Sequence, residues 1–290
     1  LHTISISNGM IESITISADD KTIQVHLKSI IDCSGDSIIS QFANLPLIKS
    51  DNYQAAAQVF TLKNVTETNE AKLGMVLMKS LREAILAKKL DHYFDRVYIV
   101  QGSLKNNNVS LKIGIPLPVT HTPENLLELK ITAHAFVKTL TDYLVKHVTA
   151  FHGASLQHIA PEIGVRVGMR TSGKYILTEE DVLKCRKFDD AIANGSWPIE
   201  EWEQNRRVKM RYFPIDDHYQ VPAGCLQSDS IDNLFTAGRN ISATDSAIAS
   251  ARVMGICLQT GYAAGKLAAA KAAGASLEEA VEQVHSELIL

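Results

Sequence analysis

The stretch from Asn233 to Lys266 reads NLFTAGRNISATDSAIASARVMGICLQTGYAAGK, and it decides the fold class of the chain. Its first apolar residues, Leu234 to Ala237, predict a short strand that Gly238 ends. From Ser250 onwards the composition predicts a long helix. Such a unit can hold an anionic or polarisable cofactor, because the glycine admits close backbone approach and free helix N–H groups carry positive potential. The same pattern also fits a buried strand followed by a core helix, which is common in α/β proteins.

Composition indicates a soluble globular chain. The 290 residues are 46% hydrophobic and 21% charged, which is enough for two lobes with separate cores. The net charge of −3 favours neither nucleic acid nor another polyanion as a partner. The most apolar segment, Val253 to Ala270, contains Gln259 and Lys266, which predicts a buried helix instead of a membrane span. We therefore expect no nucleic-acid partner and no membrane partner.

The cysteines lie far apart and show no metal-ligand spacing. They are Cys33, Cys185, Cys225 and Cys257. This pattern predicts reduced thiols in a reducing compartment, which favours the cytoplasm, and it predicts no metal site. Leu1 opens directly in a strand pattern, so we expect a piece of a longer polypeptide whose own N-terminal targeting signal lies outside this sequence.

Residues 2–33 have the alternation of a β-meander. Asn8-Gly9 is a strong two-residue hairpin signal, and Asp19 to Lys21 predicts the second turn. Lys28 to Cys33 is continuously apolar enough to predict a strand buried on both faces. The polar turn from Asp32 to Asp36 follows at its carboxyl end, where open α/β sheets place ligands. A capped turn without a ligand is the alternative.

From Pro46 to about residue 150 the pattern predicts a mixed sheet with covering helices, inserted between two parts of another domain. The expected strands are Gln54–Leu62, Tyr93–Val100 and Val109–Ile115, and the expected helices are Glu70–Lys89 and a helix capped by Thr122 that runs to about Val148.

Alternation in Pro161–Arg170 predicts a strand with Arg166 and Arg170 on one side. Two guanidiniums facing one site could bind an anionic substrate group, whereas the alternative is a surface pair bonded to acidic neighbours. Thr178 predicts a capped helix, and a small helix is expected after Asp190, ending near Asn194-Gly195.

The C-terminal part predicts two helices. Gly274 ends the long helix, and Ser276 with Glu279 forms a capping box for Leu277–Leu288. A face of small residues along the long helix predicts close packing against the sheet, so that Gly261→Leu would cost stability. The face consists of Gly255, Gly261, Ala264, Gly265 and Ala268.

Several segments together resemble one family. They are Ile30–Asp36 (like a "D-x-T-G-D" turn), Glu162–Gly173 (like "GvR…rr..G"), Val221–Leu226 (like "IPyrsL"), Asp232–Asn240 (like "dNLlvAGR") and Ser250–Met254 (like "s-x-Rvm"). The chain thus resembles the FAD-dependent oxidoreductases in which an FAD domain of the glutathione-reductase type is interrupted by a substrate domain. The resemblance implies a mixed α/β fold, with an FAD/NAD(P)-binding Rossmann-like domain in 1–45 and 216–290 and the substrate domain in 46–215.

The resemblance also implies roles for individual residues. Ser34, Gly35 and Asp36 would lie along FAD, and Gly238, Arg239 and Asn240 would contact its pyrophosphate or ribityl chain. Ser250, Ala251, Arg252, Val253 and Met254 would bring a helix N-terminus to the isoalloxazine, where it favours the reduced anion by roughly 0.3–2 kcal/mol. Arg166 and Arg170 would take the anionic group of a substrate. Cys225 is expected to be a small packing residue, with a thiol role as the alternative.

Two departures from the family pattern limit what the resemblance implies. The G-x-G-x-x-G unit that receives the pyrophosphate is not found in this sequence. Asp245 stands where the family often has histidine, and Glu200-Glu201-Trp202 stands in place of "D-x-H", so no catalytic acid or base is assigned. We expect the C-terminal portion of an enzyme that transfers hydride between a small organic substrate and flavin. The alternative is a fragment that does not bind FAD alone, or that needs a partner chain to supply the missing unit.

Overall fold

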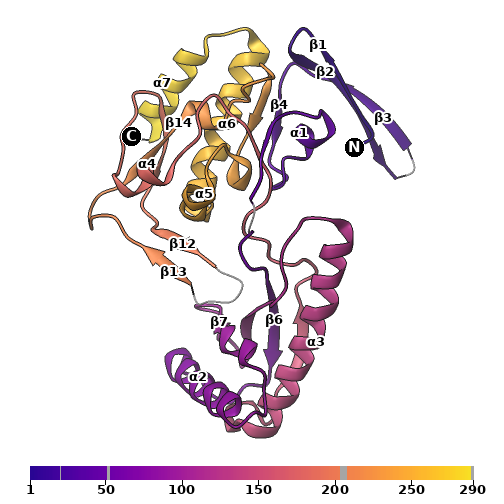
Figure 1. The fold of residues 1–290 in the computed structure, drawn as a ribbon, viewed down its shortest axis with the longest axis vertical. Coiled ribbons are helices and arrows are strands. Elements are labelled where there is room, and N and C mark those ends of the chain that lie inside the picture. Colours follow the sequence, from indigo (N-terminus) through magenta and orange to yellow (C-terminus); the bar gives the residue numbers. More distant parts are fainter. Residues whose placement is uncertain (20, 51–52, 203–207, 289–290) are drawn as a thin grey trace. The chain divides into compact units, whose positions relative to one another are not determined.

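The computed structural model describes residues 1–19, 21–50, 53–202 and 208–288 and divides the chain into two compact units. Unit 1 consists of Leu1–Asp51, Val167–Glu201 and Val208–Leu290, and unit 2 consists of Asn52–Arg166 and Trp202–Arg207. The predicted mixed α/β fold, with one unit inserted into the other, is confirmed (Figure 1). No helix in the described part of the chain has the length and apolar character that crossing a bilayer requires.

The unit boundaries differ from the predicted domain boundaries for two segments. Residues 167–201 and 208–215 were expected in the inserted domain but belong to unit 1. Backbone pairing explains this, because β11 (Ala191–Gly195) pairs with β14 (Tyr219–Pro222), and β10 (Arg170–Thr171) pairs with β5 (Leu47–Ile48). The assignment of flavin to one domain and substrate to the other stays a prediction.

The N-terminal meander forms as the sequence predicts. β1 (Thr3–Ser7), β2 (Met10–Ala18) and β3 (Lys21–His26) are antiparallel neighbours. Asn8 and Gly9 both have positive φ, of 50° and 72°, which is the turn whose twist matches a two-residue hairpin. The Asp19–Lys21 turn includes residue 20, which lies outside the described residues.

A two-stranded parallel sheet joins the beginning and the end of the chain. β4 (Ile30–Asp32) pairs with β15 (Leu234–Thr236) in register, Asp32 beside Thr236. The buried Asn233 side chain ties this pair to the meander, since it donates to the carbonyls of Ile11 and Lys28 and accepts from Ile11 N. The strand predicted at Lys28–Cys33 was expected to be buried on both faces. This is wrong, because Ile31 in β4 is 37% exposed.

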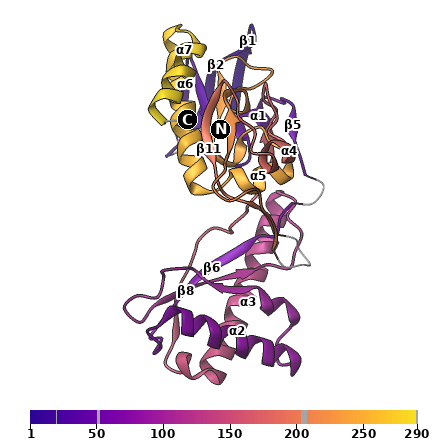
Figure 2. The same ribbon diagram turned by 90° about the vertical axis from the view of Figure 1, so that its left-hand side faces the viewer.

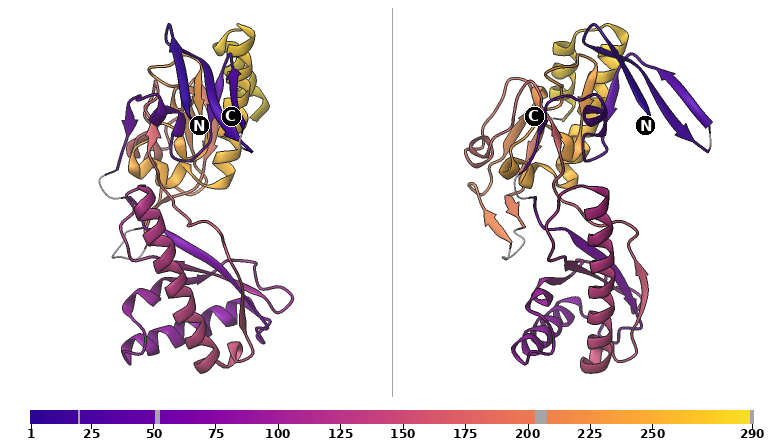
Figure 3. Two further views of the ribbon diagram at one scale, coloured as in Figure 1. Left: turned by 90° about the vertical axis from the view of Figure 1, so that its right-hand side faces the viewer. Right: turned by 45° about the vertical axis from the view of Figure 1, so that its right-hand side comes forward.

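Two helices replace the single long helix expected from Ser250. α5 (Asp245–Ala251) ends at Arg252, and α6 (Met254–Ala273) begins after Val253, whose backbone is extended (φ −72°, ψ 153°). α7 (Leu277–Leu288) packs beside α6 (Figure 3). Gly274 ends α6 in the left-handed region, as predicted.

The small residues of α6 do not share one packed face. Ala264 and Ala268 are buried, but a Cβ added at Gly255, Gly261 or Gly265 would meet no atom within 4 Å. The expectation that Gly261→Leu costs stability through backbone packing is therefore wrong.

Unit 1 also contains short helices and strands. α4 (Glu179–Leu183) starts with the predicted cap and has a full capping box. The small helix expected after Asp190 is strand β11 instead, because its backbone pairs with β14. β12 (Ile199–Glu201) pairs with β13 (Lys209–Arg211), and the short α1 (Ile38–Phe42) follows the turn after β4.

Unit 2 is a four-stranded antiparallel sheet with two long helices (Figure 2). The strand order is β7 (Val97–Ile99), β8 (Val109–Gly114), β6 (Ala57–Lys63), β9 (Ser155–Ile159). α2 (Glu70–Leu86) and α3 (Pro123–His147) bury leucines and valines against one sheet face, and Thr122 caps α3 as predicted. The first half of the strand expected at Tyr93–Val100 is the 3₁₀ helix η1 (His92–Arg96).

Most of the strand expected at Pro161–Arg170 is irregular backbone. Gly164 makes an isolated antiparallel bridge with Ala57, and only Arg170 belongs to a strand, β10. The reason is that β9 already takes the edge of the sheet next to β6, so the later segment crosses between the units as connecting chain.

Candidate cofactor site

The carboxyl ends of β4 and β15 meet around the buried side chain of Asp32. Its Oδ1 accepts hydrogen bonds from Ser34 N (2.9 Å), Ser34 Oγ (2.6 Å) and Asn240 Nδ2 (2.8 Å). Its Oδ2 accepts from Ile39 N at 2.8 Å, in the first turn of α1. Four donors to one carboxylate fix both turns relative to each other, so the predicted residues Ser34 and Asn240 lie together as expected for one site.

A second link between the two turns is the ion pair of Arg239 and Asp36. Arg239 Nη2 lies 3.3 Å from Asp36 Oδ2. Gly35 has φ 86°, and a Cβ there would lie 2.4 Å from the guanidinium. Gly168 lies against Asp36, since a Cβ there would lie 2.0 Å from Asp36 Oδ1. Gly35 is favoured by its positive φ, and Gly168 is needed because a Cβ there would also lie 2.5 Å from the backbone oxygen of Gly35.

The turn after β15 contacts α6. Gly238 starts the 3₁₀ helix η4 (Gly238–Asn240) with φ 69°, and its N–H donates to Thr260 Oγ1 at 3.2 Å. Cys257 Sγ donates to Arg252 O at 3.2 Å. These contacts place the start of α6 beside the polar turns, so strand, glycine break and helix N-terminus are connected as predicted, with the helix start moved to Met254.

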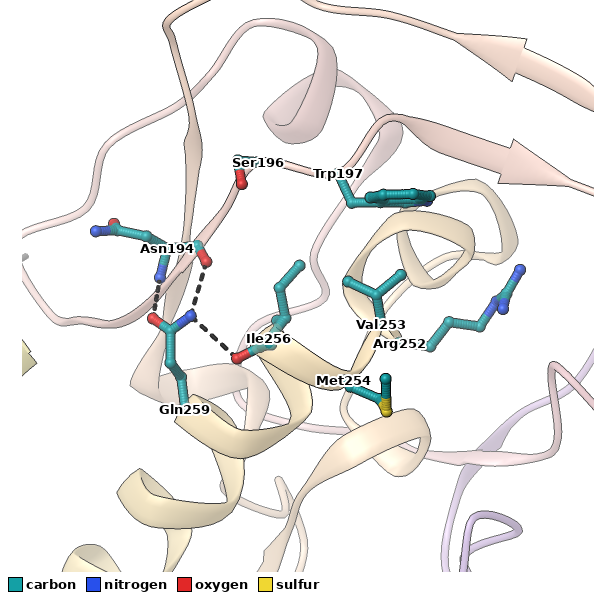
Figure 4. Close-up of a pocket in the computed structure, with 9 residues that line it drawn as sticks. Asn194, Ser196, Trp197, Arg252, Val253, Met254, Ile256 and Gln259 are labelled. Atoms are coloured by element: carbon teal, nitrogen blue, oxygen red, sulfur yellow. Dashed lines mark hydrogen bonds between the residues drawn. The ribbon is translucent and has the colours of Figure 1, made fainter. Parts of the chain in front are cut away.

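A pocket of about 600 Å³ opens at the first turn of α6 (Figure 4). Its lining includes Trp197, Arg252, Val253 and Met254, and Met254 is 84% exposed. Gln259 forms the back of the pocket by accepting from Asn194 N and donating to Asn194 O. Arg252 Nη2 donates to Glu200 O at 3.1 Å, and burial lowers the pKa of this guanidinium. The predicted Arg252, Val253 and Met254 therefore line one cavity.

Ser250 and Ala251 are placed differently from the other predicted residues. Both are fully buried in the last turn of α5. Ser250 Oγ lies 2.7 Å from Tyr219 Oη and donates to Trp197 O at 2.5 Å. In this arrangement Ser250 positions the Trp197 wall of the pocket, and its own surface is covered.

The two predicted substrate arginines do not lie on a common strand. Arg170 is fully buried in unit 1, and its Nη2 pairs with Asp245 Oδ1. Asp245, at the position where the resembling family often has histidine, also accepts from Ser50 Oγ. Arg166 belongs to unit 2, where its Nη1 donates to Ala55 O and its guanidinium lies 4.2 Å from the Trp202 ring centroid. Their roles in substrate binding stay predictions.

Burial raises the pKa of all four thiols, which is the opposite of the lowering that activates a cysteine nucleophile. Burial raises the pKa of Cys225, which is 1% exposed, and this supports its predicted packing role. Burial and then the neighbouring Asp32 raise the pKa of Cys33, and burial raises that of Cys257. Among the described residues, no group of three or more His, Cys, Asp or Glu side chains could hold a metal ion.

Comparison with known protein families identifies the family of the chain. The family model of the FAD dependent oxidoreductases matches residues 2–288. The chain belongs to that family. FAD is the cofactor of this family, as the motifs implied. No curated protein matches the chain.

Solved structures are also similar to this FAD dependent oxidoreductase chain, at low identity. A geranylgeranyl bacteriochlorophyll reductase-like protein from Thermoplasma acidophilum is 12% identical, with a TM-score of 0.41 over 98% of this chain and 52% of that one. The flavin-dependent halogenase CmlS is 12% identical, with a TM-score of 0.42 over 98% of this chain and 37% of that one. The myxobacterial chondrochloren halogenase CndH is 12% identical, with a TM-score of 0.41 over 99% of this chain and 49% of that one. The chain thus spans about half the length of the first of these structures.

The residues present fit an FAD molecule. Gly35 and Gly238 both have positive φ and lie in the turns at the carboxyl ends of the strands, which is where α/β sheets bind ligands. Arg239 places a partly exposed cation beside Gly35, which suits a phosphate. The largely apolar pocket at α6 suits a ring system.

Sequence reasoning missed four contributors to the site. Asp32 appeared only as the start of a turn, although an aspartate side chain often accepts a hydrogen bond from the backbone N–H two residues on, as it does here from Ser34 N. Asn194 and Trp197 line the pocket although both lie far from α6 in sequence, and no local signal connects them to it. Gly168 was assigned to a strand, and only its contact with Asp36 explains why it is glycine.

Proposed function

We propose that this chain forms the flavin-facing part of an FAD-dependent oxidoreductase that transfers hydride between a small organic substrate and flavin. The observation that supports it best is the convergence of three elements in unit 1: the turn after β4, the turn after β15 and the first turn of α6. FAD would supply the hydride chemistry when bound.

The chain's own residues would hold and tune the cofactor. Arg239, with Asp36 fixing its position, would attract the phosphates, and Ser34 and Asn240 would offer polar contacts nearby. The first N–H groups of α6 and the Arg252 cation carry positive potential at the pocket, which favours a negatively charged reduced ring. Trp197 and Met254 would supply apolar walls beside the ring.

The test is an FAD titration of the purified chain, followed by the visible flavin absorption band and by flavin fluorescence. Replacing Arg239 by glutamine should weaken FAD binding roughly tenfold or more, because a charge-assisted contact to phosphate contributes about 1.5–3 kcal/mol. Lys184→Gln removes an exposed cation of the same unit and should leave the affinity unchanged. Equal affinities of both variants would count against the proposed site.

A second candidate is a chain that binds FAD only with a partner chain supplying another strand. The supporting observation is the free outer edge of β4: within the described residues β4 pairs only with β15, and Ile31 is 37% exposed. Parallel sheets are normally covered on both faces, and an unpaired edge offers N–H and C=O groups to a further strand. Co-expression with a G-x-G-x-x-G strand-turn-helix unit would then restore flavin binding that the purified chain lacks.

A further inference from the structure

Helix α2 of unit 2 (Figure 1) exposes apolar side chains on the side that faces away from the core. Its inward leucines are buried against the sheet. Met75, Met78 and Leu86 are instead 61%, 62% and 75% exposed. At about 100° per residue, these three side chains lie within about 80° of one another around the helix axis. They form one line of apolar surface, which we call the outer stripe of α2.

Basic residues surround the outer stripe. Residues 72–89 include five basic side chains and one acidic side chain, Glu83, in a chain whose net charge is −3. Arg82 is four positions from both Met78 and Leu86, so it lies on the same side of the helix as they do. All five basic side chains are exposed. They are Lys72, Lys79, Arg82, Lys88 and Lys89.

Acidic partners neutralise only part of this positive charge. Lys72 pairs with Glu67 at 2.8 Å, and Lys79 lies 3.9 Å from Glu83 in an exposed pair, which is a weak interaction. The next acidic residue along the chain, Asp91, caps η1. Within the described part of the chain, the other three basic residues form no ion pair; they are Arg82, Lys88 and Lys89. The C-terminal half of α2 therefore presents positive charge together with exposed apolar surface.

Charge decides which kind of partner suits the outer stripe. Two copies of this chain that met through α2 in a symmetric contact would bring the same basic residues together, and like charges at an interface cost free energy. A bilayer with anionic headgroups offers the opposite charge. The stems of lysine and arginine can lie along the headgroup layer while their charged ends reach the phosphates. Exposed methionine and leucine side chains can insert between the lipids, because the surface of a helix is convex and a bilayer yields to it.

We propose that α2 binds the surface of bilayers that contain anionic lipids, with Met75, Met78 and Leu86 among the headgroups and the basic residues around them at the phosphates. This inference goes beyond the proposed function and does not depend on it. The sequence-based expectation of no membrane partner rested on the net charge of the whole chain and on the lack of a spanning segment. Neither of these describes the local surface of α2, where five basic residues meet one acidic residue.

The experiment is sedimentation of the purified chain with lipid vesicles. One set of vesicles contains phosphatidylcholine alone, and the other contains equal parts of phosphatidylcholine and phosphatidylserine. The chain should bind the anionic vesicles at least about tenfold more tightly than the neutral ones, because several lysine and arginine side chains lie at the surface together. Added salt should weaken this binding, because it screens exposed charges.

Matched variants separate the outer stripe from general attraction to lipid. Leu86→Gln and Arg82→Gln should each weaken binding to anionic vesicles at least about threefold, whereas Arg82→Lys, which keeps the charge, should not. The control is Leu127→Gln on α3, a leucine that is 60% exposed but has Glu124 and Glu128 beside it, and it should leave binding unchanged. All these positions are exposed, so the variants should fold, which circular dichroism checks.

Three outcomes would overturn the inference. The first is equal binding to neutral and anionic vesicles, and the second is unchanged binding in the Leu86→Gln and Arg82→Gln variants. The third is a dimer, seen by light scattering without vesicles, that Leu86→Gln dissociates, since the outer stripe would then contact a second copy of the chain. The vesicle assay needs no flavin, so FAD binding without vesicle binding would contradict this inference and leave the proposed function standing.

Discussion

At the scale of single residues, hydrogen-bonded carboxylates determine the local structure of unit 1. Asp32 joins the two turns of the candidate site. Asp181 accepts hydrogen bonds from Thr178, Tyr175 and Arg186 at the start of α4. Sequence predicted the cap at Thr178 because the capping pattern is local. It did not predict the hydrogen bond from Asn240 to Asp32, because these residues are 208 positions apart.

Asp181 leads to a prediction on pH. Burial alone would raise its pKa, but hydrogen bonds from Thr178, Tyr175 and Arg186 together lower it below the ordinary value. A lowered folded-state pKa means that the ionised form stabilises the fold above the unfolded pKa, about 3.9, and that this stabilisation is lost as pH falls through the folded value. Asp181→Asn should therefore melt below the wild type at neutral pH, and the difference should narrow on acidification. A gap in melting temperature that stays constant with pH would contradict this.

At the scale of elements, tertiary contacts override local helix propensity at two places. Ser250 to Met254 has good helix formers, yet the helix breaks at Val253, next to the Arg252 side chain that donates to Glu200 O. Residues 191–195 have no strong strand signal, yet they pair with β14. The partners, Glu200 and β14, lie far away in the sequence, so local sequence patterns do not indicate them. The sequence therefore located the elements of the site but not the residues at which they end.

The open side of α6 gives the second prediction. Gly261→Ala should raise the free energy of unfolding by up to about 1 kcal/mol, because the added methyl meets nothing and alanine is the better helix former. Gly168→Ala should lower it, because its methyl would lie 2.0 Å from Asp36 Oδ1. Chemical denaturation of both variants measures the contrast. A destabilised Gly261→Ala variant would mean that this face of α6 is covered in the native protein.

At the scale of the whole molecule, the two units have separate cores. Sequence predicted that one unit interrupts the other, because the composition changes near Pro46, but it misplaced residues 167–201, whose pairing partners lie elsewhere in the chain.

Separate cores predict separable mutational effects. Leu140, fully buried in unit 2, should cost about 2–5 kcal/mol of stability when changed to alanine. Leu127 on the same helix is 60% exposed, and its change to alanine should cost less than about 0.5 kcal/mol. FAD affinity at a temperature where both variants are folded should equal that of the wild type. A Leu140→Ala variant that loses FAD affinity while folded would show that the site depends on unit 2.

The bond between Asn233 and Ile11 spans 222 positions of the chain. In unit 2, by contrast, paired residues can be closer in the sequence, such as Thr61 and Ser110, which are 49 positions apart. During synthesis on the ribosome, the inserted unit can complete its core while the meander still waits for β15 to be translated. The apolar residues of β4 and the meander would stay in water during that interval.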